Sequence, residues 1–123
     1  MFLNTKKQGD WGLGQAIAYF TSIGWTVALP LTDSQDYDII VDNGNQLLRV
    51  QVKTTTFKQR GVNYFVSLTT KGGNQSFNTI KSFDHNTVDY IFVITGDNDR
   101  YFIPSDVVGN SISLGKLYDK YRV

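Results

Sequence analysis

Apolar residues in the first part of the chain recur at the spacing of one helical face. They stand at i, i+3, i+4 and i+7 positions: Leu13, Ala16, Ile17, Phe20 and Ile23. Asn4 or Thr5 is a suitable N-cap, and Gly24 is suited to end the last turn. Short polar side chains cap free N–H groups, and glycine accepts a left-handed backbone. The pattern therefore predicts a helix over residues 6–22.

Residues 37–52 combine two apolar runs with a turn between them. The runs at 37–41 and 47–52 flank a segment that contains Asn43-Gly44, and this pair favours a β-hairpin because both residues accept positive φ. Side chains alternate along a strand. If the apolar faces of both strands meet one core, then Asp38, Gln51 and Lys53 project together from the opposite face.

The later chain favours short strands separated by turns. Strands are expected at residues 25–29, 63–69, 88–95, 100–103 and 111–114. A loop is expected at 70–76 and helical turns at 77–83 and 104–106. A long N-terminal helix followed by strands predicts an α+β fold, in which the helix packs on a mixed β-sheet.

Composition narrows the possible functions. The chain has 123 residues, no cysteine and a net charge of +1, which predicts a single domain over residues 1–123 and excludes a disulfide framework. The lack of cysteine fits a reducing, cytoplasmic setting. We expect no membrane association, because there is no signal peptide and no apolar run near the roughly 20 residues that a span requires. With so small a net charge, any nucleic-acid binding has to depend on a local patch.

The polar face of the hairpin offers groups suited to metal-assisted phosphodiester hydrolysis. Mg²⁺ prefers hard oxygen ligands. The Asp38 carboxylate, the Gln51 amide oxygen and the backbone carbonyl of Val52 are such ligands. Lys53 adds an ammonium group that can stabilise negative charge and position a metal-activated water. All acidic residues of the chain are aspartates, so carboxylate chemistry depends on Asp.

Two segments of the hairpin resemble the core motif of the PD-(D/E)xK nucleases. They are residues 37–40 (YDII) and 51–54 (QVKT). The closer resemblance is to the group I intron-encoded homing endonucleases, in which Gln takes the acid position before the lysine. Residues 7–12, 24–27, 89–93 and 102–104 also fit that pattern.

The resemblance implies a fold, an activity and roles for residues. The fold would be a restriction-endonuclease-like core, and the activity a DNA endonuclease that depends on Mg²⁺ or Mn²⁺. Asp38 would bind the metal with Gln51 as a variant ligand, and Lys53 would be the catalytic lysine.

One position departs from the family pattern. The family commonly carries Glu on the first helix, where this chain has Leu13. Asp10 stands three residues earlier, on roughly the same helical face, and is a candidate replacement ligand. The loss of the acid also leaves open a catalytically inactive DNA-binding module on the same fold.

The expected partner is double-stranded DNA. Candidate DNA-binding residues are Arg49, Lys58, Arg60 and Lys71. Cleavage of both strands requires two active sites, so we expect a homodimer or a homotetramer. Two further alternatives are a Holliday-junction resolvase-like enzyme on the same core and a protein-interaction domain that binds no nucleic acid.

Overall fold

The computed structural model describes residues 4–71 and 80–123. Helix α1 (Thr5–Ser22) begins at Asn4, whose side-chain oxygen accepts a hydrogen bond from the backbone N–H of Lys7 at 2.9 Å. This bond satisfies one of the free donors of the first turn. The chain leaves the helix through Gly24, which has a φ of 84°. The predicted helix, its N-cap and its terminating glycine are therefore confirmed.

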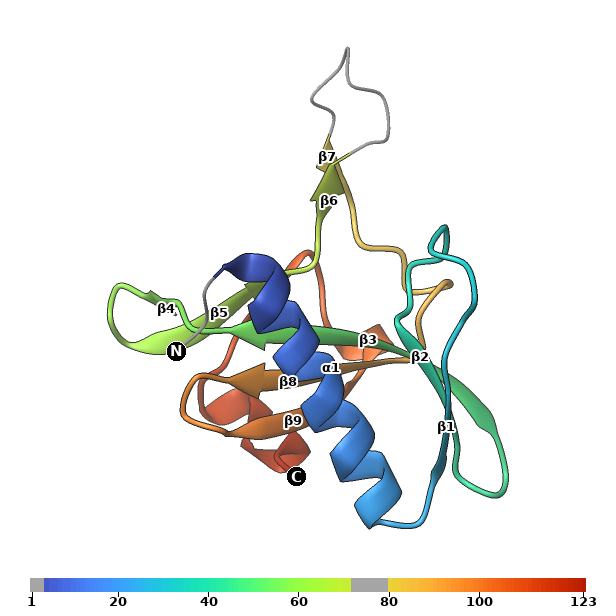
Figure 1. Cartoon of the computed structure of the whole chain (residues 1–123). Helices are drawn as coiled ribbons and strands as arrows, with labels where there is room; N and C mark the ends of the chain where they lie inside the picture. Colours follow the sequence, from blue (N-terminus) through green and yellow to red (C-terminus); the bar gives the residue numbers. More distant parts are fainter. Residues whose placement is uncertain (1–3, 72–79) are drawn as a thin grey trace.

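The main sheet has five strands in the order β1-β2-β3-β8-β9 (Figure 1). Their bounds are β1 (Thr26–Ala28), β2 (Ile39–Asp42), β3 (Leu47–Thr55), β8 (Tyr90–Thr95) and β9 (Arg100–Pro104). Strands β2 and β3 form the predicted antiparallel hairpin, with Ile39 opposite Val50. Strand β3 pairs with β8 in parallel, and β8 pairs with β9 antiparallel. The expected mixed sheet is confirmed.

Helix α1 covers one face of this sheet (Figure 1). The buried residues between them form one core: Ala16, Phe20, Ile39, Val41, Leu48, Val50, Phe92 and Ile94. The middle strand β8 is buried on both sides, because Phe92 and Ile94 face the helix while Ile91 and Val93 face a second core. An α+β fold with the long helix packed on a mixed sheet results, as the sequence predicted.

A smaller layer covers the other face of the main sheet. It contains a three-stranded sheet in the order β10-β5-β4 and two short 3₁₀ helices. The bounds are β4 (Lys58–Gln59), β5 (Asn63–Ser67), η1 (Ser105–Val107), β10 (Ser111–Ser113) and η2 (Lys116–Tyr121). Val66 and Leu68 pack there against Ile91, Val93 and Ile103.

A short two-stranded ribbon stands away from the main sheet (Figure 1). It pairs β6 (Thr70–Lys71) with β7 (Ile80–Lys81) in antiparallel orientation. The sequence prediction of a loop at 70–76 and a helical turn at 77–83 is wrong for these paired residues, and residues 72–79 lie outside the described part. Each strand of the ribbon is only two residues long, so the sequence contains no alternation that would predict it, which explains the error.

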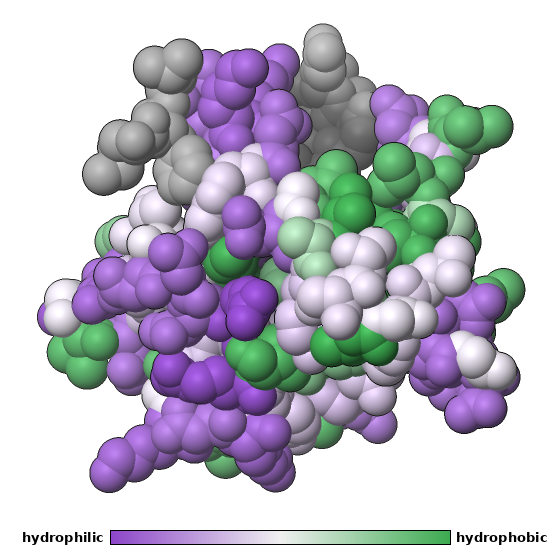
Figure 2. Space-filling model, turned by 60° about the horizontal axis from the view of Figure 1, so that its bottom comes forward, coloured by the Kyte–Doolittle hydropathy of each residue, from purple (hydrophilic) through white to green (hydrophobic). Residues whose placement is uncertain are grey.

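The surface is mixed in character. Figure 2 shows hydrophilic and hydrophobic side chains interspersed over the face that it presents. Within the described residues, no helix has both the length and the apolar character needed to cross a membrane.

Candidate functional site

Strand β3 has an open edge where β2 begins. The register of the hairpin starts with Ile39 opposite Val50, and the backbone N–H of Asp38 donates to the Val50 carbonyl at 2.9 Å. The N–H and C=O groups of strand residues alternate between the two edges with a period of two. Val52 therefore presents its N–H and C=O to the same edge as Val50, at a point that lies past Ile39, the first residue of β2. The side chain of Asp38 takes the place of the missing strand, because its Oδ2 accepts from the Val52 N–H at 2.7 Å.

A hollow of about 260 Å³ lies between this edge and helix α1. It is lined by Gly9, Asp10, Leu13, Asp38 and Val52. The structure thus places both candidate carboxylates, those of Asp10 and Asp38, at a hollow that Val52 also lines. These are hard oxygen donors of the kind that Mg²⁺ and Mn²⁺ prefer.

The first turns of α1 are fixed near this edge. The Gln8 side-chain amide donates to the Thr54 carbonyl at 3.3 Å, so the helix start is tied to β3 two residues beyond Val52. Leu13 is partly buried and packs against the helix-side core. It forms an apolar wall of the hollow where the resemblance leads one to expect a carboxylate.

The donor set fits a divalent cation only in combination with the backbone and water. Among the described residues, no three His, Cys, Asp or Glu side chains cluster in a way that could hold an ion. Mg²⁺ is commonly bound through one or two carboxylates and keeps several waters. Asp38, Asp10 and the Val52 carbonyl are compatible with that arrangement.

Desolvation dominates the electrostatic setting of the Asp38 carboxyl group. Although the residue is exposed, its carboxyl group is held against β3, and the resulting desolvation raises its pKa above the ordinary value. The hydrogen bond from Val52 and the charge of Lys53 lower the pKa to a smaller extent. Lys53 therefore lies close enough to Asp38 for the two charges to interact. A cation in the hollow would offset this desolvation and stabilise the ionised carboxylate.

Gln51 lines a different hollow, on the side of β3 that faces Leu68 and Phe83. This hollow has a volume of about 10 Å³, which is close to the minimum for one water. Gln51 is only 8% exposed, and its Oε1 is buried without a hydrogen-bond partner among the described residues. Gln51 and Asp38 do not share a hollow, so the structure does not bring these two side chains together as the hairpin pattern predicted. The role of Gln51 as a metal ligand stays a prediction.

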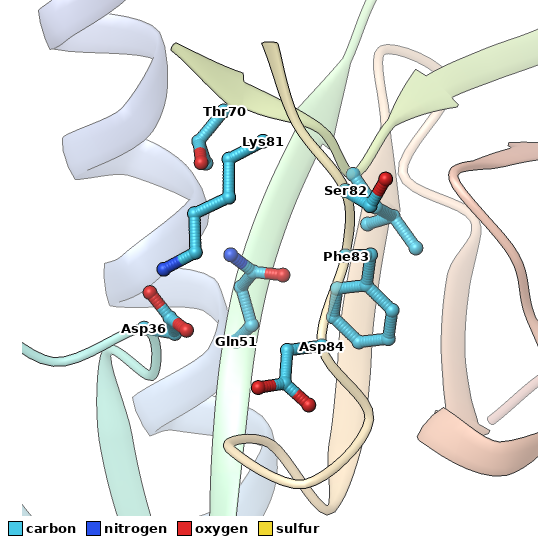
Figure 3. A pocket seen from close by; sticks show the side chains of 8 residues that line it. Asp36, Gln51, Thr70, Lys81, Ser82, Phe83 and Asp84 are labelled. Atoms are coloured by element: carbon cyan, nitrogen blue, oxygen red, sulfur yellow. The ribbon is translucent and has the colours of Figure 1, made fainter. Parts of the chain in front are cut away.

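The hollow beside Gln51 gathers charged residues that the sequence analysis did not connect with the site. Figure 3 shows Asp36, Lys81 and Asp84 around the Gln51 amide. Lys81 reaches this position from the base of the β6–β7 ribbon, and the pairing that brings it there has no signature in the local sequence.

Arg49, a candidate DNA contact, forms an ion pair with Asp89. Its Nε and Nη2 donate to the Asp89 carboxylate at 3.1 Å each, and its backbone N–H donates to the same carboxylate at 2.8 Å. These bonds lower the pKa of Asp89. The pair ties β3 to the start of β8. A DNA-binding role for Arg49 stays a prediction, and would require the guanidinium to serve both partners.

The other candidate DNA contacts lie on the smaller layer and the ribbon. Lys58 is exposed, lies 3.8 Å from Asp97 and sits over the ring of Tyr64. Arg60 is exposed in the tight turn after β4, with a φ of 55°. Lys71 belongs to β6, and its side chain lies outside the described part. Their contacts with DNA stay predictions.

Comparison with known proteins agrees with this fold. A family model described as PD-(D/E)XK endonuclease matches residues 3–118. The bacterial homing endonuclease I-Ssp6803I is 27% identical, with a TM-score of 0.82 over 97% of this chain and 88% of that chain.

A second solved structure shares the fold alone. It is Hjc, a Holliday junction resolvase from Archaeoglobus fulgidus, at 10% identity and a TM-score of 0.56 over 94% of this chain and 89% of that chain. No curated protein gives a match. The family model covers nearly all of the chain, and the resemblance expected from residues 37–40 and 51–54 is confirmed. The chain belongs to the PD-(D/E)XK endonuclease family.

Proposed function

We propose that this chain is a DNA endonuclease that depends on a divalent cation and is related in function to homing endonucleases. Family membership and the similarity to I-Ssp6803I, which is a homing endonuclease, support the class of activity. The observation that carries the proposal is the placement of the Asp38 carboxylate beside the Val52 peptide, at a hollow also lined by Asp10.

Mg²⁺ or Mn²⁺ would be held by Asp38 and the Val52 carbonyl, with Asp10 as the second carboxylate. Bound there, the cation would supply Lewis-acid polarisation of a phosphodiester and lower the pKa of a water. The hydrogen bond from Val52 fixes Oδ2 of Asp38 and leaves Oδ1 available. Gln51 is retained as an assisting ligand, which requires its side chain to turn from the hollow that it now lines.

Lys53 acts as the catalytic lysine in this proposal. Its ammonium group interacts electrostatically with Asp38 and can stabilise negative charge that develops on a phosphate. It can also hold a water in position for attack. Lys53 follows Val52 in β3, so the strand fixes the backbone of the lysine next to the peptide that would bind the metal.

Double-strand cleavage would require a second copy of the site. A homodimer, or a tetramer of two such dimers, supplies two sites related by symmetry. Sedimentation with and without duplex DNA tests this part of the proposal.

The proposal is tested by cleavage of plasmid DNA in Mg²⁺ and in Mn²⁺. We expect wild-type protein to cleave, and Asp38→Ala and Lys53→Ala to lose cleavage. Lys116→Ala, at an exposed position of η2, is the matched control and should keep it. Cleavage that persists in purified Asp38→Ala or Lys53→Ala would contradict the proposed roles.

A non-catalytic DNA-binding module is the second candidate, and Leu13 favours it because this residue gives the hollow an apolar wall. This alternative predicts DNA binding that persists in EDTA, with no cleavage of linear duplex, plasmid or four-way junction. Cleavage of junctions in preference to linear duplex would indicate a resolvase-like activity instead.

A further inference from the structure

Lys81 lies beside strand β3, and the proposed function does not use this residue. It is a residue of β7, and its side chain extends toward Asp36 and Gln51 instead of away from the sheet (Figure 3). Lys81 and Asp36 line the small hollow beside Gln51. Both also line a second hollow of about 260 Å³, which reaches Arg49 and Thr87.

The ammonium group of Lys81 is not committed to an ion pair. Within residues 4–71 and 80–123, the ion pairs at 4.0 Å or less involve Arg49, Lys58 and Arg122, but not Lys81. Asp36 faces it, yet Oδ2 of Asp36 already accepts from the Thr87 hydroxyl at 2.8 Å. Lys81 is exposed. It is therefore an available cation that a carboxylate attracts without binding it closely.

We propose that Lys81 binds a backbone phosphate of DNA adjacent to the proposed cleavage site. Without DNA, the Asp36 carboxylate attracts the Lys81 ammonium group, and the phosphate replaces this carboxylate when DNA binds. The inference rests on the proposed function. Lysine binds phosphate as a compact point charge, and the hollow of about 260 Å³ leaves room for a phosphate at its mouth.

The position of Asp36 relates this phosphate to the cleavage site. Asp36 and Asp38 are two residues apart, so their Cα atoms are separated by at most ~7 Å. Phosphates follow each other along one strand of duplex DNA at about 3.4 Å per step of the helix axis. Two sites this close together can contact neighbouring phosphates of one DNA strand.

Binding of a random-sequence DNA duplex, measured by fluorescence anisotropy in EDTA over a series of salt concentrations, tests the inference. The variants are Lys81→Gln, Asp36→Asn and the double variant, with Lys116→Gln as control for net charge. Asn at position 36 keeps an oxygen acceptor for Thr87, so the loop is preserved.

Loss of one phosphate contact should reduce the slope of log K against log salt by about 0.9. We expect this in Lys81→Gln but not in Lys116→Gln. Asp36→Asn should bind DNA more tightly than wild type, because it removes the competing carboxylate, and the double variant should behave as Lys81→Gln.

Equal slopes in Lys81→Gln and Lys116→Gln would overturn the inference and leave the proposed function standing. Weaker binding in Asp36→Asn would also overturn it, since the carboxylate would then support binding. Failure of wild type to bind DNA in a salt-dependent manner would instead overturn the proposed function itself, and the inference with it.

Discussion

The carboxylate of Asp38 accepts a hydrogen bond from the backbone N–H of Val52 at 2.7 Å. The Asp38 side chain here replaces a strand that would otherwise pair with this edge of β3. The Val52 N–H group is therefore satisfied although β2, which begins at Ile39, does not reach it. The same bond fixes one carboxylate oxygen beside the Val52 carbonyl. The sheet edge and the candidate metal site are therefore built by the same two residues.

Gly12→Ala should destabilise the protein. Gly12 is buried, and a Cβ atom there would lie 1.8 Å from Thr54 Oγ1 and 3.2 Å from Thr54 Cβ. The Thr54 side chain or helix α1 would have to shift, at a cost of about 1–3 kcal/mol in the free energy of unfolding. Urea denaturation followed by circular dichroism measures this change.

Gly14→Ala is the matched control in the same helix. In the described part of the chain, no atom beyond the adjacent residues and the nearby helix backbone lies within 4 Å of a Cβ built at Gly14, so alanine should stabilise the helix by about 0.5–1 kcal/mol. Destabilisation of similar size in both variants would show that the contact with Thr54 does not determine the result.

Leu13→Glu should strengthen metal binding. Leu13 lines the hollow that Asp10 and Asp38 share, so a carboxylate there would add negative charge near the cation. We expect roughly tenfold higher affinity for Mn²⁺, equivalent to about 1.4 kcal/mol, measured by calorimetry. Because Leu13 is partly buried, the free energy of unfolding should fall by about 1–2 kcal/mol.

Leu117→Glu controls for added charge, since Leu117 is 75% exposed on η2. It should leave Mn²⁺ affinity unchanged. If Leu13→Glu also leaves the affinity unchanged, the hollow beside Asp38 is not the metal site.

Asp89→Asn should reduce stability in a manner that depends on pH. The Arg49 hydrogen bonds lower the pKa of Asp89 below its ordinary value of 3.8, so the ionised carboxylate is favoured in the folded state. Its contribution is complete at neutral pH and is lost as pH falls below 3.8 toward the lowered folded-state value. Both side chains are more than a third exposed, at 39% and 34%, and we expect the pair to contribute about 1 kcal/mol or less.

Thermal unfolding of wild type and Asp89→Asn across this pH range measures the effect. The difference between the two proteins should shrink on acidification, whereas Asp106→Asn, at an exposed position of η1, should show no such trend. A difference that grows as pH falls would contradict the assigned role of the Arg49–Asp89 pair.

Much of the core fold could be predicted from local patterns. Apolar spacing and the Asn4 cap predict helix α1, and Asn43-Gly44 predicts the β2–β3 hairpin. In the turn, Gly44 has a φ of 94° and its N–H donates to the Asp42 carboxylate at 2.8 Å. These features depend on neighbouring residues only, so the sequence carries them directly.

The surroundings of Gln51 could not be predicted in the same way. Its side chain lies beneath Leu68 and Phe83, which reach β3 through the β5 and β7 connections. Strand alternation correctly separates Gln51 from Val52, but it does not show what covers each face. The Arg49–Asp89 pair likewise depends on the parallel pairing of β3 with β8, a contact between segments distant in sequence.

The most direct test of the account is calorimetric titration of Mn²⁺ into wild type, Asp38→Asn and Asp33→Asn. Asparagine at position 38 keeps an acceptor for the Val52 N–H while it removes the charge, and Asp33 is an exposed loop residue. The account predicts that binding is lost in Asp38→Asn and retained in wild type and Asp33→Asn. Equal Mn²⁺ affinity in wild type and Asp38→Asn, or no binding to wild type, would contradict it.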